Sequence, residues 1–397
     1  FFTFIVSFFV ACYGLNVISK NRKRGINSTN NQKIIGDDNL PALDILVAAR
    51  DEENVIERLV ERLFNLDYPT NKLNIYIIDD GSSDKTPLIL ERLSREFDKL
   101  KIISRSANAG GGKSGALNYA LKFTYGEWLL ILDADAQLKK DTLPRLFNFV
   151  YEGSWSAVQL RKSVINVSKN FLTTCQSMEM AMDAIFQYGR LSVAGVSELR
   201  GNGQLINKEV LLKCGSFNED TVTDDLDLSL RLLLSKAKIG ILWDPPVMEE
   251  AVENISALFS QRQRWAEGGL QRFFDYGEQL FSNKIELIQK FDLTFFFILQ
   301  YALPIISMID LILSIALAES PSYWLISITA FTLSGIAVWY GSSCKSEGPV
   351  LQNLNLMMML VSLLYLSHWF LVIPWVTLKM SIFPKKILWK KTLHTGV

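Results

Sequence analysis

Residues 127–138 read EWLLILDADAQL, and this stretch decides the fold. Its apolar run, WLLIL, is short and bounded by charged residues, which predicts a strand rather than a helix. Asp133 and Asp135 follow the run two positions apart, so in extended backbone their side chains point the same way. The stretch therefore predicts a buried strand that ends in two carboxylates on one face.

Other short apolar runs flank this strand and alternate with helical stretches. The runs are LDILVAA (43–49), NIYIIDD (74–80), KIISRS (101–106) and SAVQLR (156–161), and the helical stretches include ENVIERLVERLFN (53–65) and DKTPLILERLSREF (84–97). This alternation predicts an α/β, Rossmann-like domain with a mainly parallel sheet covered on both faces. Such sheets bind ligands beyond the carboxyl ends of their strands, where Asp79, Asp80, Asp133 and Asp135 stand.

Residues 106–121, SANAGGGKSGALNYAL, contain glycines followed by Lys113 and Ser114, as in the phosphate loop of nucleoside triphosphatases. That loop requires a further glycine where this chain has Ala107, and only about twenty residues separate Lys113 from Asp133. Both features argue against a nucleoside triphosphatase. Glycines and a free helix N-terminus still suit a phosphate group, although a glycine turn with a surface lysine is the alternative.

The carboxylates indicate a metal ion and a general base. Asp133 and Asp135 would repel each other unless a cation or hydrogen bonds join them, and hard oxygen ligands suit Mg²⁺ or Mn²⁺ with a diphosphate completing the shell. Simple capping of the strand end is the alternative. The chain has only two histidines, His368 and His394, so a base in its first two-thirds should be a carboxylate. An aspartate in TVTDDLDLSLRL (221–232) is the best candidate, although the helix dipole alone also favours acidic residues there.

Four motifs occur in order along the chain: DDGSSD (79–84), DAD (133–135), TDD (223–225) and QRQRW (261–265). In this order and spacing they resemble the inverting family 2 glycosyltransferases of GT-A fold, which include membrane-bound cellulose and hyaluronan synthases. The resemblance covers residues 44–270. Within the family, RWAEGGLQRFFDYGEQL (264–280) and GNGQLINKEVL (201–211) are similar to the cyanobacterial β-monoglucosyldiacylglycerol synthases. The family usually has Glu at the position of Asp224, and Asn-Glu where this chain has Asp51-Glu52.

The resemblance implies a role for each matching residue. It implies that a UDP-sugar donor is held by Asp51, Glu52, Asp79 and Asp80, with Lys113 and Asp133 at its ribose or diphosphate. It implies a Mg²⁺ or Mn²⁺ ion bound by Asp133 and Asp135, and it makes Asp225 the base that deprotonates the acceptor. The residues at the acceptor and the diphosphate would be Asp224, Gln261, Arg264 and Trp265. A single displacement would then turn an α-linked donor into a β-linked product.

Residues 1–19 are long and apolar enough to cross a bilayer, and the basic KNRKR (20–24) that follows is expected in the cytoplasm with the catalytic domain. A cleaved signal peptide is the alternative, but signal peptides carry their positive charge before the apolar run. Three later apolar runs lie near 293–317, 323–340 and 354–378, and the middle one is short. Three crossings would leave the basic KKILWKK (385–391) outside the cell. Two explanations stay open: one run is re-entrant or interfacial, or the tail breaks the positive-inside rule.

These patterns divide the chain into six parts. They are an N-terminal transmembrane helix (1–19), a linker (20–40), a GT-A catalytic domain (41–254), a basic and aromatic segment (255–290), C-terminal transmembrane helices (291–380) and a basic tail (381–397). The segment 255–290 suits the membrane–water interface, or alternatively a surface helix packed on the catalytic domain.

Composition and span number narrow the function. The 41 basic and 41 acidic residues balance, so nothing indicates a nucleic-acid partner, and the four cysteines show no paired spacing. Export of a polymer needs a channel of several packed helices, whereas a few spans suffice to seat an enzyme at the lipid surface. We therefore expect transfer of a single sugar to 1,2-diacylglycerol, and the resemblance implies that the donor is UDP-glucose and the product β-monoglucosyldiacylglycerol. A processive β-glycan synthase and an inactive membrane scaffold are the alternatives, and the oligomeric state stays open.

Overall fold

A computed structural model of the chain describes residues 2–23, 36–349, 355–383 and 396. Within this described part, seven strands form one sheet in the order β3-β2-β1-β4-β6-β5-β7. The pairs β1–β2, β2–β3, β1–β4 and β5–β7 are parallel, whereas β6 runs antiparallel to β4 and β5. The strands are β1 (Leu43–Ala49), β2 (Leu73–Asp79), β3 (Leu100–Ser104), β4 (Trp128–Leu132), β5 (Ala157–Val164), β6 (Gln204–Asn207) and β7 (Ile239–Glu249). The prediction of a mainly parallel α/β sheet is confirmed.

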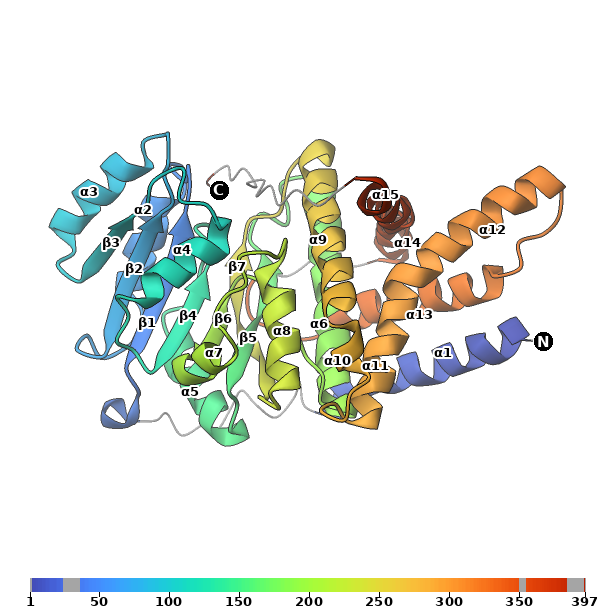
Figure 1. Cartoon of the computed structure of the whole chain (residues 1–397), viewed down its shortest axis with the longest axis horizontal. Coiled ribbons are helices and arrows are strands. Elements are labelled where there is room, and N and C mark those ends of the chain that lie inside the picture. Colours follow the sequence, from blue (N-terminus) through green and yellow to red (C-terminus); the bar gives the residue numbers. More distant parts are fainter. Residues whose placement is uncertain (1, 24–35, 350–354, 384–395, 397) are drawn as a thin grey trace.

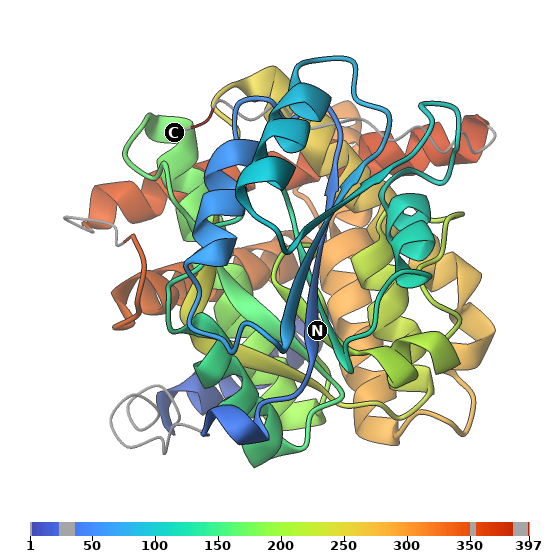
Figure 2. The ribbon, with the colours of Figure 1, turned by 90° about the vertical axis from the view of Figure 1, so that its left-hand side faces the viewer.

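Helices cover both faces of the sheet (Figure 2). One face packs on α2 (Ile56–Phe64), α3 (Thr86–Glu96) and α5 (Thr142–Gly153), and the other on α4 (Gly112–Leu121), α7 (Lys208–Lys213) and α8 (Asp224–Leu234). Side chains of β4 alternate between the two cores: Leu130 and Leu132 join the first, and Leu129 and Ile131 join the second. Because every residue of β4 is apolar and buried, this strand lies at the centre of the domain.

Two long helices lie between the sheet domain and the apolar helices (Figure 1). They are α6 (Phe171–Ala194) and α9 (Ile255–Asp275), and the short α10 (Gly277–Leu280) follows α9. Asn170 and Asn254 cap α6 and α9 by accepting hydrogen bonds from backbone N–H groups of their first turns. Helix α9 contacts α8 on one side and the C-terminal apolar helices on the other, and both Arg262 and Arg272 are buried. It therefore joins the two parts of the molecule.

Among the described residues, four helical stretches are long and apolar enough to cross a membrane: 2–19, 287–317, 324–343 and 356–382. The corresponding elements are α1 (Phe2–Ser19), then α11 (Leu287–Phe297), η3 (Ile298–Ala302) and α12 (Leu303–Leu317), then α13 (Trp324–Ser343), and finally α14 (Leu356–Leu366) with α15 (Trp369–Ile382). Large apolar side chains at the tip of α12, including Leu311, Ile315 and Leu317, are exposed. A helix that exposes such residues is suited to lipid rather than to water. The short middle run of the sequence forms a full twenty-residue helix, α13.

Helices α14 and α15 differ from the others in direction. Figure 1 shows α1, α12 and α13 lengthwise, pointing away from the sheet, whereas α15 is seen almost end-on. Near the C-terminus, the Gly396 N–H donates to Glu250 of the sheet domain, at 3.2 Å. The C-terminal end therefore lies beside the sheet domain.

Parts of two predicted segments fall outside the described residues. The linker 20–40 is described only at its ends, as η1 (Lys20–Lys23) and from residue 36 onward, including η2 (Asp37–Asn39). The basic tail 381–397 is described at 381–383 and at 396, so the lysine-rich stretch 385–391 lies outside.

Candidate active site

A cavity of about 960 Å³ opens at the carboxyl ends of the central strands and extends to the apolar helices. Its size lies within the range of ligand-binding clefts. Among the predicted residues, those that line it are Glu52, Asp80, Lys113, Asp133, Asp135, Asp224, Asp225, Gln261, Arg264 and Trp265. The structure thus brings together residues that are up to about two hundred positions apart in the sequence.

The glycine-rich loop forms one wall of this cavity. Gly110, Gly111 and Gly112 all have positive φ, which lets three successive peptide groups follow a path that side chains would forbid. The loop leads into the N-terminus of α4, which presents backbone N–H groups, and Lys113 and Ser114 of its first turn also line the cavity. This wall is suited to an anion, as expected for a diphosphate.

Lys113 connects this wall to the central strand. Its Nζ atom lies 2.5 Å from Asp133 Oδ1 and donates to the Gly201 carbonyl at 3.2 Å. Burial alone would lower the pKa of Lys113, but the charges of Asp133, Asp224 and Asp225 outweigh it and raise that pKa. Lys113 is therefore a fixed positive charge among carboxylates.

Of the acidic residues predicted to bind the donor near the end of β2, Asp51 and Asp79 hold the turn after that strand, whereas Asp80 faces the cavity. The carboxylate of Asp79 accepts from the Ser82 N–H, and that of Asp51 accepts from the Ser83 N–H at 2.6 Å, so both hold the turn itself. Neither is among the residues that line the cavity. Asp80 does line it, and burial raises the pKa of its carboxyl group while the nearby Arg105 lowers it.

Asp133 and Asp135 lie on the cavity wall as the sequence predicts. The Asp133 side chain is 37% exposed, whereas Asp135 is buried and its Oδ2 atom accepts from the Glu250 N–H at 2.8 Å. In the described ranges, no group of three or more His, Cys, Asp or Glu side chains is arranged to hold a metal ion. A buried oxygen of Asp224, Oδ2, has no hydrogen-bond partner. Carboxylate oxygens such as those of Asp133 and Asp135 are hard ligands of the kind that suits a divalent cation, with a diphosphate completing its shell.

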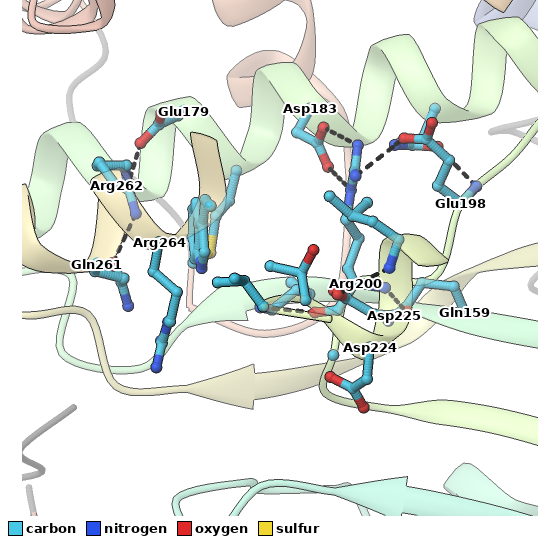
Figure 3. Close-up of a pocket in the computed structure, with 18 of the residues that line it drawn as sticks. Gln159, Glu179, Asp183, Glu198, Arg200, Asp224, Asp225, Gln261, Arg262 and Arg264 are labelled. Atoms are coloured by element: carbon cyan, nitrogen blue, oxygen red, sulfur yellow. Dashed lines mark hydrogen bonds and ion pairs between the residues drawn. The ribbon is translucent and has the colours of Figure 1, made fainter. Parts of the chain in front are cut away.

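Asp224 and Asp225 occupy the first turn of α8 and face the same cavity (Figure 3). Burial and the adjacent charge of Asp224 raise the pKa of Asp225 to about 6, and the Arg200 guanidinium acts in the opposite direction. Burial likewise raises the pKa of Asp224. A carboxyl group with such a pKa is ionised at neutral pH yet basic enough to accept a proton from a hydroxyl group.

The residues of the QRQRW motif extend from α9. Figure 3 shows Arg264 directed into the cavity, where burial lowers the pKa of its guanidinium while Asp133, Asp224 and Asp225 raise it. Arg262 also lines the cavity but is almost fully buried, with its Nη2 atom 2.5 Å from Glu179 Oε2 and its guanidinium 4.1 Å from the Trp265 ring centre. The Gln261 side chain accepts from Arg262 at 2.6 Å. Arg262 therefore fixes the side chains of Gln261 and Trp265, which also line the cavity.

Sequence reasoning missed Arg200, a charged residue of the cavity wall, and Arg105, the partner of Asp80 behind that wall. Arg200 pairs with Asp183 of α6 at 2.9 Å and with Glu198 at 3.0 Å, and Arg105 pairs with Asp80 at 2.6 Å. No motif marks Arg200–Asp183 or Arg105–Asp80, because each of these two pairs joins separate elements. Position offered one signal: Arg200 directly precedes the GNG turn (201–203), whose Asn202 donates to Glu249 and accepts from the Asp133 N–H.

Comparison with known proteins identifies the family of this chain. The chain is 41% identical to the β-monoglucosyldiacylglycerol synthase of Trichormus variabilis over 361 residues, which is 90% of this chain and 77% of that protein. The Glycosyl transferase family 2 model also matches residues 44–213. This chain belongs to glycosyltransferase family 2.

Other family 2 relatives extend the comparison. The β-monoglucosyldiacylglycerol synthase of Synechocystis is 40% identical over 359 residues, covering 89% of this chain and 75% of that protein. Among solved structures, the mannosyltransferase of Pyrobaculum calidifontis, determined with GDP-Man and Mn²⁺, covers 94% of this glycosyltransferase chain and 95% of its own. The two share 18% identity and a TM-score of 0.59, which shows a common GT-A fold.

Proposed function

We propose that this glycosyltransferase moves glucose from UDP-glucose to the free hydroxyl of 1,2-diacylglycerol and releases β-monoglucosyldiacylglycerol at the cytoplasmic face of the membrane. One observation carries the proposal: a single cavity joins the carboxylates and Lys113 to the walls of candidate membrane helices. A lipid hydroxyl can reach the sheet domain along such a path. The names of the relatives at 40–41% identity support the same choice of acceptor.

In this proposal Asp225 accepts the proton of the acceptor hydroxyl, whose oxygen attacks C1 of glucose. The bond between C1 and UDP breaks on the opposite face, and its electron pair stays on the diphosphate, so an α-linked donor gives a β-linked product. The Asp225 pKa of about 6 suits this step at neutral pH.

The remaining residues act on the donor. Lys113 and Arg264 bring positive charge to the diphosphate, and Glu52 and Asp80 contact the uridine. Asp51 and Asp79 hold the turn that positions Asp80. Asp133 and Asp135 would hold Mg²⁺ or Mn²⁺, which when bound supplies Lewis-acid neutralisation of the leaving diphosphate. Asp224, Gln261 and Trp265 border the acceptor side.

The test uses membranes from cells that express the chain, supplied with UDP-glucose labelled in the sugar. We expect label in a chloroform-soluble monoglucosyl lipid, with the large anomeric proton coupling constant of a β-linkage. Membranes carrying Asp225→Asn are the matched control and should show no labelled lipid. Label in an ethanol-insoluble polymer would contradict the proposal and favour a processive β-glycan synthase. A parallel assay with UDP-galactose measures the donor preference.

A further inference from the structure

The cavity has two chemically different ends. The end at the sheet is lined by the charged residues described above, whereas the far end, here called the apolar branch, lies among α6, α11–α13 and α15. The apolar branch is defined by Phe186, Phe296, Leu299, Ala330, Phe331 and Phe370. Aromatic pairs form part of its wall: the Phe186 and Phe296 rings lie 5.9 Å apart, and the Phe331 and Phe370 rings 5.8 Å apart.

The two ends meet at Phe296. The Arg190 guanidinium, which also lines the cavity, lies 4.3 Å from the centre of the Phe296 ring. Arg190 in turn pairs with Glu198, and Glu198 with Arg200, the neighbour that lowers the pKa of Asp225. A ligand with a hydroxyl group at Asp225 and a long apolar tail could therefore lie along one continuous path.

Helix α13 presents one face to this path. Ala330, Phe331 and Ser334 line the cavity, and Ser334 lies four residues after Ala330 and three after Phe331, which is the spacing of a helix face. Ser334 donates its hydroxyl to the Ala330 carbonyl at 3.0 Å, so its polarity is used within the helix. Ile328 lies on the other side of the helix and is 53% exposed. This face of α13 therefore offers hydrocarbon contacts.

A π-helix shapes the opposite wall. In η3 the Leu303 N–H donates to the Ile298 carbonyl, five residues back, and Pro304 next along the chain has no N–H to donate. The wider turn places Leu299 and Pro304 on the cavity wall. Such π-bulges are frequent at functional sites.

We infer that the apolar branch holds one acyl chain of the lipid acceptor while its hydroxyl group lies at Asp225. The inference rests on the proposed function and adds where the tail of the acceptor lies. An acyl chain gains little by leaving bilayer hydrocarbon for an apolar cavity, because both surroundings are equally apolar. Its contribution is to orientation: a held chain limits the positions of the hydroxyl and so raises the reaction rate.

The experiment compares two acceptors, a diacylglycerol with eighteen-carbon chains and one with eight-carbon chains. Ala330→Phe fills the apolar branch, and Ile328→Phe, on the lipid-facing side of the same helix, is the matched control. We expect Ala330→Phe to lower kcat/KM for the long-chain acceptor about tenfold relative to the short-chain acceptor, with UDP binding unchanged. Ile328→Phe should leave this ratio as in the unsubstituted protein. An equal loss for both acceptors, or no loss, would overturn the inference.

Two further measurements test the same inference independently of Ala330→Phe. Phe331→Ala enlarges the branch, so a change in the long-to-short ratio is expected there even if Ala330→Phe does not fold. A diacylglycerol with a diazirine at the end of one acyl chain should label peptides of α12 and α13, and labelling confined to α1 or α14 would contradict the inference. If the unsubstituted protein makes no glucosyl lipid, the proposed function fails; if it makes the lipid without chain-length dependence, only this inference fails.

Discussion

Two neighbours of Asp225 pull its pKa in opposite directions. Burial and the negative charge of Asp224 raise that pKa to about 6, whereas the Arg200 guanidinium lowers it. A general base works only when deprotonated, so we expect kcat/KM to fall as the pH drops through about 6. The pH dependence of kcat/KM, measured with UDP-glucose and a soluble diacylglycerol, gives this acidic limb of the profile. A profile that stays flat down to pH 4 would remove Asp225 from the role of base.

Substitution of Asp224 or Arg200 should shift the pH at which kcat/KM falls, in opposite directions for the two residues. Asp224→Asn removes a repelling charge, so the limb should shift to lower pH. Arg200→Gln removes a favourable charge, so the limb should shift to higher pH. The shifts are measured on relative rates, which separates them from any general loss of activity. Shifts in the same direction for both variants would contradict the charge arrangement described here.

The pair of Arg262 and Glu179 makes a second prediction at this scale. Arg262 is almost fully buried, and burial would raise the pKa of Glu179, but the guanidinium outweighs it and lowers that pKa. Arg262→Met would leave the buried Glu179 carboxylate without its cationic partner, held only by hydrogen bonds from Tyr365 and Trp369. Breaking a buried ion pair in this way costs about 3–5 kcal/mol of folding free energy. Unfolding in detergent should show this loss, and the double variant with Glu179→Gln should recover much of it. A double variant no more stable than Arg262→Met would contradict this explanation.

At the scale of elements, two adjacent glycines let α9 approach both of its neighbours. A Cβ atom at Gly268 would lie 2.7 Å from the Cβ of Thr223, the residue that precedes Asp224 and Asp225 at the start of α8. A Cβ atom at Gly269 would lie 2.9 Å from the Tyr301 ring in η3. Real side chains do not come so close, so glycine at these two positions sets the spacing of α8, α9 and η3.

We therefore predict that Gly268→Ala displaces the first turn of α8 and lowers kcat between about tenfold and a hundredfold. Binding of UDP, which depends mainly on other elements, should change much less. Gly277→Ala is the matched control, because a Cβ atom there would meet no atom within 4 Å. Turnover measurements on both variants decide the matter, and equal activity of the two would show that the contact with Thr223 does not position Asp225.

The same elements show which features of the fold and the site could be predicted from the sequence. The run 43–49 forms β1 over those residues, and the carboxylates after β2 and β4 stand at strand ends, because an apolar run and the residues that follow it are local features. Strand β6 was not predicted: it has four residues, and its antiparallel place between β4 and β5 depends on contacts with distant strands. Arg200, Arg105 and Glu179 were missed for the same reason, since their partners come from other elements.

At the scale of the whole molecule, the structure indicates how many of the apolar helices cross the membrane, which the sequence left open. From the sequence alone, three crossings after a cytoplasmic catalytic domain would place the basic tail outside the cell, against the positive-inside rule. In the structure Gly396 contacts Glu250 of the sheet domain, and Glu347, just after α13, pairs with Lys139 and Arg145 of the same domain. The described residues that precede and follow the α14–α15 stretch at Glu347 and Gly396 thus both contact the sheet domain. We therefore expect α12 and α13 to cross out and back, and α14–α15 to remain in the membrane without crossing it.

This arrangement predicts which positions are accessible from each side of the membrane. In a protein whose four native cysteines are replaced, Ser320→Cys, in the exposed turn between α12 and α13, should react with an impermeant maleimide in intact cells. Tyr125→Cys, which is 81% exposed on the sheet domain, should react only after the membrane is permeabilised. A cysteine appended after Val397 should behave like Tyr125→Cys, because α14–α15 returns the chain to the side on which it began. Labelling of the appended cysteine in intact cells would mean that α14–α15 crosses the bilayer, and the basic tail would then be an exception to the positive-inside rule.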